Sequence, residues 1–159
     1  MAQPVKILMV CLGNICRSPM AEGILQAKIE KYKLHAEVDS AGFEPFHTGD
    51  APDFRATRTM KQYGIDISGQ RSRLFRESDF DDFDRIYVMD NGNFNDVKSV
   101  ARNSKQLKKV DYILNTSHPG SNKPVPDPYY GGELGFEKTY QLLDIAIEQI
   151  AQELRNGGK

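Results

Sequence analysis

The stretch VKILMVCLGNICRSP, residues 5–19, runs from an apolar segment through a turn into the start of a helix. Val5–Val10 is apolar except for Lys6, which is typical of a strand buried on both faces of a parallel sheet. After the turn, Ser18 is suited to cap a helix and Pro19 to occupy its first position. A buried strand that leads directly into a helix is the first unit of an α/β fold.

Strands and helices alternate along the rest of the chain. Short apolar runs predict strands at Val5–Val10, Ala36–Ser40, Arg85–Met89 and Val110–Leu114. Helical spacing and caps predict helices from Ser18 to about Tyr32, from about Asp53 to Gly64, after Asp90, and from about Glu133 to Leu154. The segments 42–52, 68–76 and 115–132 are expected to be loops. This alternation predicts the α/β class, with a parallel sheet that carries helices on both faces.

The composition is that of one ordinary globular domain. The 159 residues are 39% hydrophobic and 27% charged, and no repeat or linker divides them, so we expect a single domain over residues 1–159. Lys and Arg number 21 against 22 Asp and Glu, and this balance argues against a nucleic-acid partner. No apolar run approaches the roughly 20 residues of a membrane-spanning helix. We therefore expect no membrane partner and a cytoplasmic location.

The cysteines and histidines suggest neither a disulfide framework nor a metal site. Cys11 and Cys16 are the two cysteines of the chain, too few and too close together for the framework of a small secreted domain. The histidines, His35, His47 and His118, lie far apart and show no zinc-binding spacing. The sequence therefore predicts no metal and no cofactor.

The turn after the first strand has the features of an anion site. Its amide groups can curl around an anion of phosphate size, beside the partial positive charge of a helix N-terminus. Gly13 permits a tight backbone, Asn14 tolerates positive φ, and Arg17 can grip two phosphate oxygens with its planar fork. We expect a phosphate group, whether free or on a substrate, to contact the remaining residues of the turn: Leu12, Gly13, Asn14, Ile15, Cys16 and Ser18.

A thiol at the start of this turn distinguishes it from a nucleotide-binding loop. A Walker motif needs Gly-Lys-Ser/Thr, which this turn lacks. Cys11 lies instead where the amides, Arg17 and the helix N-terminus favour the thiolate, and a thiolate at the base of a phosphate site can attack phosphorus in line. Taken alone, Cys11 could simply be a small residue that ends a buried strand. Its combination with Arg17 and Ser18 favours the nucleophile.

Two further residues of the turn have two interpretations each. Ser18 is suited either to cap the helix or to support the Cys11 thiolate with its hydroxyl. Cys16 either fills space beneath the loop or lies within reach of Cys11 for a disulfide after oxidation.

A second part of the site is predicted at residues 125–130, VPDPYY. Hydrolysis of a phosphate ester needs a proton for the leaving oxygen, and Asp127 is the best candidate acid because prolines on both sides restrict its backbone. An Asp between prolines is otherwise an ordinary turn residue. Tyr129 and Tyr130, with Phe46 from the earlier loop, can form the walls of a slot for a flat substrate group.

Four stretches together resemble the low-molecular-weight protein tyrosine phosphatases, and the resemblance covers essentially the whole chain. They are residues 10–22 (VCLGNICRSPMAE), Ser40-Ala41-Gly42, Val88-Met89-Asp90 and Asp127-Pro128-Tyr129-Tyr130. The resemblance implies a three-layer domain with a four-stranded parallel sheet, a phosphocysteine intermediate and no metal. It also implies that the substrates are aromatic phosphate monoesters and that the partner is a tyrosine-phosphorylated protein.

The resemblance also implies a role for each matching residue. The nucleophile falls on Cys11, the phosphate-binding arginine on Arg17, the loop-bracing asparagine on Asn14, the supporting serine on Ser18 and the general acid on Asp127. Two positions depart from the family pattern. Many members have a histidine where this chain has Gln70, and many have a tryptophan where it has Phe46. We therefore expect the Gln70 amide to brace Asn14.

Two other functions remain alternatives. An arsenate reductase-like redox enzyme also uses a thiolate in an anion loop, but its relay needs further thiols and no cysteine follows Cys16. A non-catalytic phosphotyrosine-binding module could use the same loop without turnover, although binding alone requires neither Cys11 nor Asp127. The presence of both residues favours the phosphatase.

Overall fold

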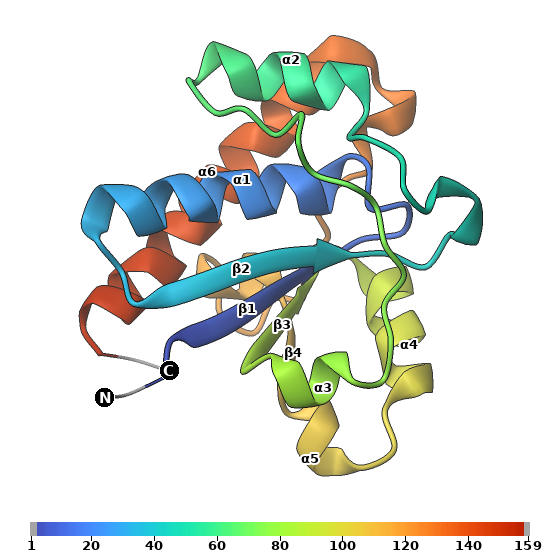
Figure 1. Ribbon diagram of the computed structural model, residues 1–159, viewed down its shortest axis with the longest axis vertical. Helices are drawn as coiled ribbons and strands as arrows, with labels where there is room; N and C mark the ends of the chain where they lie inside the picture. The colour runs from blue at the N-terminus through green and yellow to red at the C-terminus, as the bar shows by residue number, and fades with distance from the viewer. Residues whose placement is uncertain (1–2, 158–159) are drawn as a thin grey trace.

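The four strands form one parallel sheet of order β2-β1-β3-β4 in the computed structural model, which describes residues 3–157 (Figure 1). The strands are β1 (Val5–Val10), β2 (Ala36–Ala41), β3 (Arg85–Val88) and β4 (Val110–Tyr112). The predicted α/β class with four parallel strands is confirmed. Residues 1–2 and 158–159 of the predicted domain lie outside the described part.

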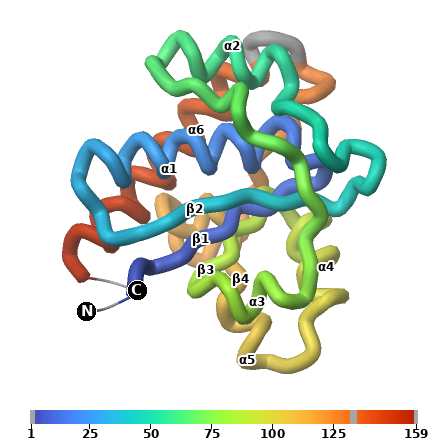
Figure 2. Tube along the Cα trace, viewed as in Figure 1, coloured from blue at the N-terminus to red at the C-terminus, as the bar shows by residue number. Residues whose placement is uncertain are grey.

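Helices cover both faces of the sheet. In Figure 1, α1 (Arg17–Tyr32), α2 (Phe54–Gln62) and α6 (Gly132–Arg155) lie on one side, and α3 (Asp79–Asp82), α4 (Asn91–Val100) and α5 (Ser104–Leu107) lie on the other. The sequence did not predict the short helices α3 and α5. Figure 2 shows α2, from the middle of the chain, beside α6 from its end, and the two helices are in contact.

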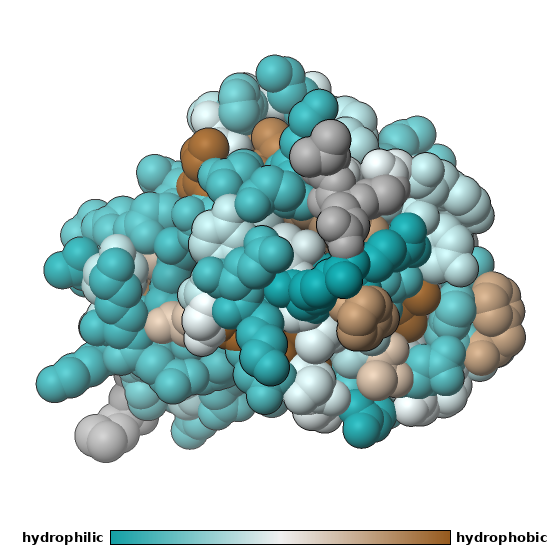
Figure 3. Space-filling model, turned by 90° about the horizontal axis from the view of Figure 1, so that it is seen from above, coloured by the Kyte–Doolittle hydropathy of each residue, from teal (hydrophilic) through white to brown (hydrophobic). Residues whose placement is uncertain are grey.

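Alternate residues of β1 pack into two separate cores, because successive side chains of a strand point to opposite faces. Ile7 and Met9 join the core under α1 and α6, whereas Leu8 and Val10 join the core under α3 and α4. All four side chains are fully buried, as the apolar run predicted. The surface seen in Figure 3 is largely hydrophilic, and its apolar side chains form separate patches.

Chain order places the first turn at a switch point of the sheet. From β1 the chain moves to β2 on one side and then to β3 on the other. The carboxyl end of β1, where Cys11 follows, therefore lies between two crossover connections that leave in opposite directions. Ligands of open α/β sheets bind in such crevices.

Several predicted boundaries differ from the structure: β2 extends to Ala41, β3 ends at Val88 and α1 begins at Arg17. β4 ends at Tyr112 because Ile113–Thr116 turn into a 3₁₀ helix that buries both Ile113 and Leu114. The predicted loops contain short 3₁₀ helices at Pro45–His47 and Pro128–Tyr130. Ile113 and Leu114 are two consecutive apolar residues, and such a pair looks the same in sequence whether it ends a strand or begins a 3₁₀ helix.

Candidate active site

The turn between β1 and α1 places the Cys11 thiol against the first turn of the helix. Cys11 is buried, and its sulfur accepts from the backbone N–H of Ser18, with N and Sγ 3.4 Å apart. The Ser18 hydroxyl lies 3.0 Å from the same sulfur. Both contacts stabilise negative charge on sulfur, in addition to the partial positive charge of the helix N-terminus.

The alternative in which Ser18 caps the helix is wrong. α1 begins at Arg17, Cys16 occupies the N-cap position without a side-chain cap bond, and Ser18 is already the second residue of the helix. A capping hydroxyl must precede the free amides that it accepts from, so from this position it turns to the sulfur instead. Pro19 is correspondingly the third helical residue.

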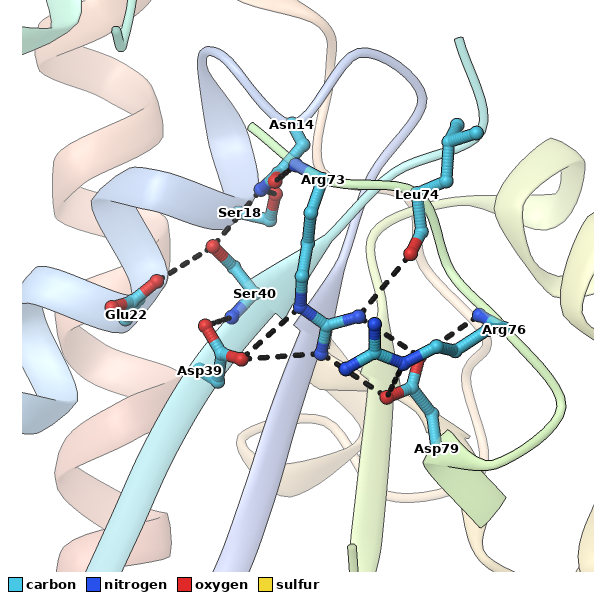
Figure 4. A network of polar contacts seen from close by, with 9 residues as sticks. All are labelled: Asn14, Ser18, Glu22, Asp39, Ser40, Arg73, Leu74, Arg76 and Asp79. Carbon is cyan, nitrogen blue, oxygen red and sulfur yellow. Dashed lines mark hydrogen bonds and ion pairs between the residues drawn. The ribbon is translucent and has the colours of Figure 1, made fainter. Parts of the chain in front are cut away.

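Asn14 braces the turn from behind (Figure 4). Its backbone has φ of 55°, as expected for an asparagine in a tight loop. Its Nδ2 donates to Ser18 Oγ at 2.8 Å and to Ser40 Oγ at 2.9 Å, and its Oδ1 accepts from Arg73 N at 3.0 Å. Because the Ser18 hydroxyl accepts from Asn14, its own proton is free to point at Cys11. Ser40 in turn donates to Glu22 Oε1 at 2.6 Å.

The prediction that Gln70 braces Asn14 is wrong. Gln70 Nε2 donates to the Pro19 carbonyl at 3.1 Å, and its Oε1 is buried without a hydrogen-bond partner among the described residues. The acceptor of Asn14 is instead taken by the Arg73 N–H. The Arg73 guanidinium is bound on both sides by Asp39, within β2, and by Asp79, so this otherwise irregular segment is fixed beside the loop (Figure 4).

Gly42 explains why the chain can pass so close to the loop at this point. A Cβ added at Gly42 would lie 2.8 Å from the Asn14 Cβ and 2.9 Å from the Leu12 carbonyl oxygen. Real side chains do not tolerate such distances, so the residue after Ser40 and Ala41 has to be glycine for β2 to support the turn.

Arg17 is a buried cation fixed beside the thiol. Its Nη1 donates to Asp90 Oδ2 at 2.6 Å and to the Val125 carbonyl at 2.9 Å, and its Nη2 lies 3.7 Å from Asp127 Oδ2. Burial acts to lower the pKa of Arg17, but the nearby Cys11 and Asp90 raise it above its ordinary value. The guanidinium therefore keeps its charge although its side chain is only 3% exposed.

Asp90 was predicted only as a helix cap, and it has a second role. Its Oδ1 accepts from Asn93 N and caps α4, while its Oδ2 binds Arg17. A carboxylate just beyond the carboxyl end of β3 is brought to the β1 turn because β1 and β3 are neighbours in the sheet. The position of Asp90 after a predicted strand could have indicated a role in the site. To recognise that role, one also had to know that β3 lies beside β1 in the sheet.

One cavity of about 220 Å³ connects the two predicted parts of the site. Its base is formed by Cys11, Leu12, Gly13, Ile15, Cys16 and Arg17, and its walls by Glu44, Phe46, His47, Asp127, Tyr129 and Tyr130. The aromatic walls are open to solvent, since 73% of Phe46 and 89% of Tyr130 are exposed. The sequence did not predict that Glu44 and His47 line the cavity. Both lie in a loop, where no periodic pattern indicates which side chains point toward the cavity.

Two of the residues expected to contact the anion have other side-chain partners. The side chains of Asn14 and Ser18 are buried behind the turn and do not line the cavity. Among residues 3–131 and 135–157, no group of three or more His, Cys, Asp or Glu side chains is arranged to hold a metal ion. No helix among the described residues is long and apolar enough to cross a membrane.

The structure bears on the two interpretations of Cys16. Both cysteines are free and buried. Burial and the neighbouring Asp53 raise the pKa of the Cys16 thiol above its ordinary value. Because the thiolate is the reactive form, a thiol that keeps its proton is a weak partner for disulfide exchange, which favours the packing role.

Glu22 predicts a pH-dependent stability that a glutamine should remove. Burial raises the pKa of Glu22 from 4.5 to about 7, and the Ser40 hydrogen bond offsets this only in part. An acid that binds its proton more tightly when folded stabilises the fold fully below its unfolded pKa, and this stabilisation is lost as pH rises toward 7. At 1.36 kcal/mol per pKa unit, the loss is on the order of 3 kcal/mol.

We therefore expect Glu22→Gln to be more stable than the wild type near pH 8, with little of that difference remaining at about pH 4.5. Urea unfolding of both proteins across this range measures the difference. Glu30→Gln, at an exposed position of the same helix, is the matched control. Parallel pH profiles for wild type and Glu22→Gln would contradict the assignment.

Comparison with known proteins agrees with this geometry. The family model for low molecular weight phosphotyrosine protein phosphatase matches residues 6–159. A phosphatase of that name from Schizosaccharomyces pombe is 39% identical over 150 residues, which are 92% of this chain and 95% of the relative.

Solved structures show the same fold. YfkJ from Bacillus subtilis has a TM-score of 0.90 at 34% identity, with 99% of each chain covered. The protein tyrosine phosphatase from Entamoeba histolytica, solved with Hepes in its active site, has a TM-score of 0.88 at 35% identity, covering 96% of this chain and 98% of its own. The chain therefore belongs to the low molecular weight phosphotyrosine protein phosphatases, which are cysteine-dependent hydrolases of phosphate monoesters.

Proposed function

We propose that Cys11, Arg17 and Asp127 divide between them the hydrolysis of phosphotyrosine on a protein substrate. In the first step the Cys11 thiolate attacks phosphorus, the bond to the phenolic oxygen breaks, and Asp127 gives its proton to that oxygen. In the second step water attacks the phosphocysteine, the Asp127 carboxylate takes a proton from that water, and the Cys11 thiolate leaves. The products are a tyrosine side chain and inorganic phosphate.

The single observation that carries the proposal is the shared cavity. Cys11 and Arg17 form part of its base, and Asp127 forms part of its wall. The thiol has donors from Ser18 on its protein side, so that its other side is directed to the ligand. Nucleophile, cation and acid thus face one space in which a phosphate ester can meet all three.

Arg17 and the loop amides support the phosphate end of this assignment. A guanidinium held in place by Asp90 and Val125 is preorganised for the charge of a phosphoryl group in the transition state. The Entamoeba relative holds Hepes, whose sulfonate is a tetrahedral anion, in its active site. We infer that a phosphate group, either of a substrate or free in solution, occupies the same loop in this protein.

The cavity walls support an aromatic ester as the substrate. Tyr129 and Tyr130 pack edge to face with their ring centroids 5.0 Å apart. The ring centroids of Phe46 and His47 are 4.4 Å apart, with the two rings tilted to each other. Such rings form apolar walls for a planar phenyl group at a small cost in conformational entropy. The partner is then a protein that exposes phosphotyrosine. A cytoplasmic location, expected because no apolar run approaches the length of a membrane-spanning helix, stays a prediction.

Release of phosphate from a phosphotyrosyl peptide in the presence of a chelator tests the function directly. We expect turnover, with transient labelling of Cys11 by phosphate detected by mass spectrometry after acid quench. A non-catalytic binding module would retain the peptide without releasing phosphate. A redox enzyme of the arsenate reductase type would instead consume a thiol reductant during turnover.

Replacing Asp127 with alanine should affect poor leaving groups most. We expect kcat/KM for phenyl phosphate to fall by about 10²- to 10⁴-fold, the usual contribution of a positioned acid. For p-nitrophenyl phosphate, whose phenolate leaves readily without a proton, the loss should be much smaller. The ratio kcat/KM is the right measurement because it covers the steps up to the first irreversible bond cleavage.

Asp81→Ala, exposed on α3, is the control for removal of a surface carboxylate. It should change neither value. Equal losses for the two esters in Asp127→Ala would mean that another group donates the proton.

A further inference from the structure

Arg55 lies on α2, and it does not line the cavity. It is placed between the segment that carries Asp127 and the turn of residues 11–18, here called the phosphate loop. Its guanidinium contacts two parts of the protein at once. We propose that Arg55 is a positioning residue that ties the Asp127 segment to the phosphate loop and so orients the general acid. This proposal rests on the role given to Asp127 in the proposed function.

The first set of contacts holds the acid segment. Arg55 Nη1 donates to the Tyr129 carbonyl at 2.9 Å. The guanidinium also lies over the Tyr129 ring at 5.1 Å and over the Phe136 ring, at the start of α6, at 4.8 Å. Cation–π contacts of this kind add to the hydrogen bond and restrict the ring as well as the backbone of Tyr129. Tyr129 is therefore held at its carbonyl and at its side chain.

The second set of contacts joins Arg55 to the phosphate loop. Arg55 Nε and Nη2 bind the two oxygens of Asp53, each at 3.1 Å. The backbone N–H of Asp53 donates to the Ile15 carbonyl in the phosphate loop at 2.7 Å. Asp53 also caps α2 by accepting from Arg55 N. Asp53 and Arg55 are thus bound rigidly to α2 and to the phosphate loop that contains Cys11.

The link from Arg55 to the acid passes through one residue. Tyr129 N donates to Asp127 Oδ1 at 3.0 Å, while Tyr129 O accepts from Arg55. A carboxylate held at Oδ1 by Tyr129 presents Oδ2 to the Arg17 side of the cavity, where the two groups lie 3.7 Å apart. Movement of Tyr129 would therefore rotate the carboxyl away from the leaving oxygen. Arg55 itself touches no reacting atom.

The shape of arginine is needed for this function. One planar group binds the Asp53 carboxylate on one edge, donates to a carbonyl with another nitrogen, and stacks on two aromatic rings. The ammonium group of a lysine is a point charge on a flexible chain and cannot make all of these contacts. Lysine should therefore conserve the charge beside Asp53 but lose part of the orientation of Tyr129.

The test compares Arg55→Gln and Arg55→Lys with wild type on two esters. We expect kcat/KM of Arg55→Gln for phenyl phosphate to fall by about tenfold or more, a part of the 10² to 10⁴ that a positioned acid supplies. For 2,4-dinitrophenyl phosphate, which needs no acid, the loss should stay within about threefold. Arg55→Lys should show the same selectivity with a smaller loss, and it keeps a cation beside Asp53 if Arg55→Gln does not fold.

Arg58→Gln is the matched control. Arg58 lies one turn further along α2, with its guanidinium over the Phe54 ring at 4.9 Å, and it contributes nothing to the cavity lining. Its replacement should change neither kcat/KM. Thermal unfolding of each variant separates a loss of fold from a loss of orientation.

The Asp127→Asn variant separates this proposal from the proposed function. If Asp127→Asn loses activity equally on both esters, the acid assignment itself is wrong. If Asp127→Asn is selective and Arg55→Gln or Arg55→Lys is not, the acid stands and the positioning role of Arg55 is overturned. In the double variant with Asp127→Asn, Arg55→Gln should cost little more on phenyl phosphate, because the group that it orients can no longer donate as an acid.

Discussion

Cys11→Ser is expected to lower kcat for p-nitrophenyl phosphate by at least about 10⁴-fold, the scale seen when a covalent nucleophile is removed. The reason is the chemistry of the nucleophilic atom. A cysteine sulfur is intrinsically a strong nucleophile, whereas a serine hydroxyl needs a general base to remove its proton. Among the described residues, the sulfur forms hydrogen bonds only with the amide and hydroxyl of Ser18, and neither is a base.

The same variant should keep its fold and its affinity for anions. Serine is slightly smaller than cysteine, and the loop amides and Arg17 are unchanged. Calorimetric titration with inorganic phosphate and thermal unfolding measure both properties. No phosphorylated intermediate should form on the variant with p-nitrophenyl phosphate. Residual turnover of more than about one per cent of wild type would contradict a covalent mechanism at Cys11.

Arg17→Lys is expected to lower kcat/KM by about 10²- to 10³-fold, as the loss of a preorganised donor in a buried site typically does. The buried guanidinium binds Asp90 and the Val125 carbonyl with one nitrogen and leaves the rest of its fork toward the cavity. Lysine keeps a positive charge beside Asp90, so this carboxylate is not left unpaired. A single ammonium cannot hold Asp90 and also grip two phosphate oxygens.

The inhibition constant of inorganic phosphate, measured with circular dichroism on the same samples, distinguishes binding from folding. Phosphate should bind Arg17→Lys more weakly, while the spectrum stays that of wild type. If kcat/KM remains within about tenfold of wild type, a bidentate grip by Arg17 is not required, and the loop amides alone suffice.

Local patterns were sufficient to predict the framework of the site. The apolar run Val5–Val10, the turn with Cys11 and Arg17, the helix from about Asp53 and the cap Asp90 all depend on residues close in sequence. A periodic pattern or a capping residue therefore identifies them. The same is true of Asp127 between its prolines. The errors in local structure were small: element ends that shifted, as at Tyr112 and Arg17, and the short helices α3 and α5, which were not predicted.

What the sequence alone determined, therefore, is the α/β order of the chain and the chemical groups of its first turn. Only the tertiary structure decided which partners hold those groups. Asn14 is bound by Ser40 and Arg73 rather than Gln70, and Arg17 by Asp90, because the order β2-β1-β3-β4 puts the ends of β2 and β3 on either side of the turn. A side chain's hydrogen-bond partners depend on distances between segments far apart in sequence, and no local pattern records those distances.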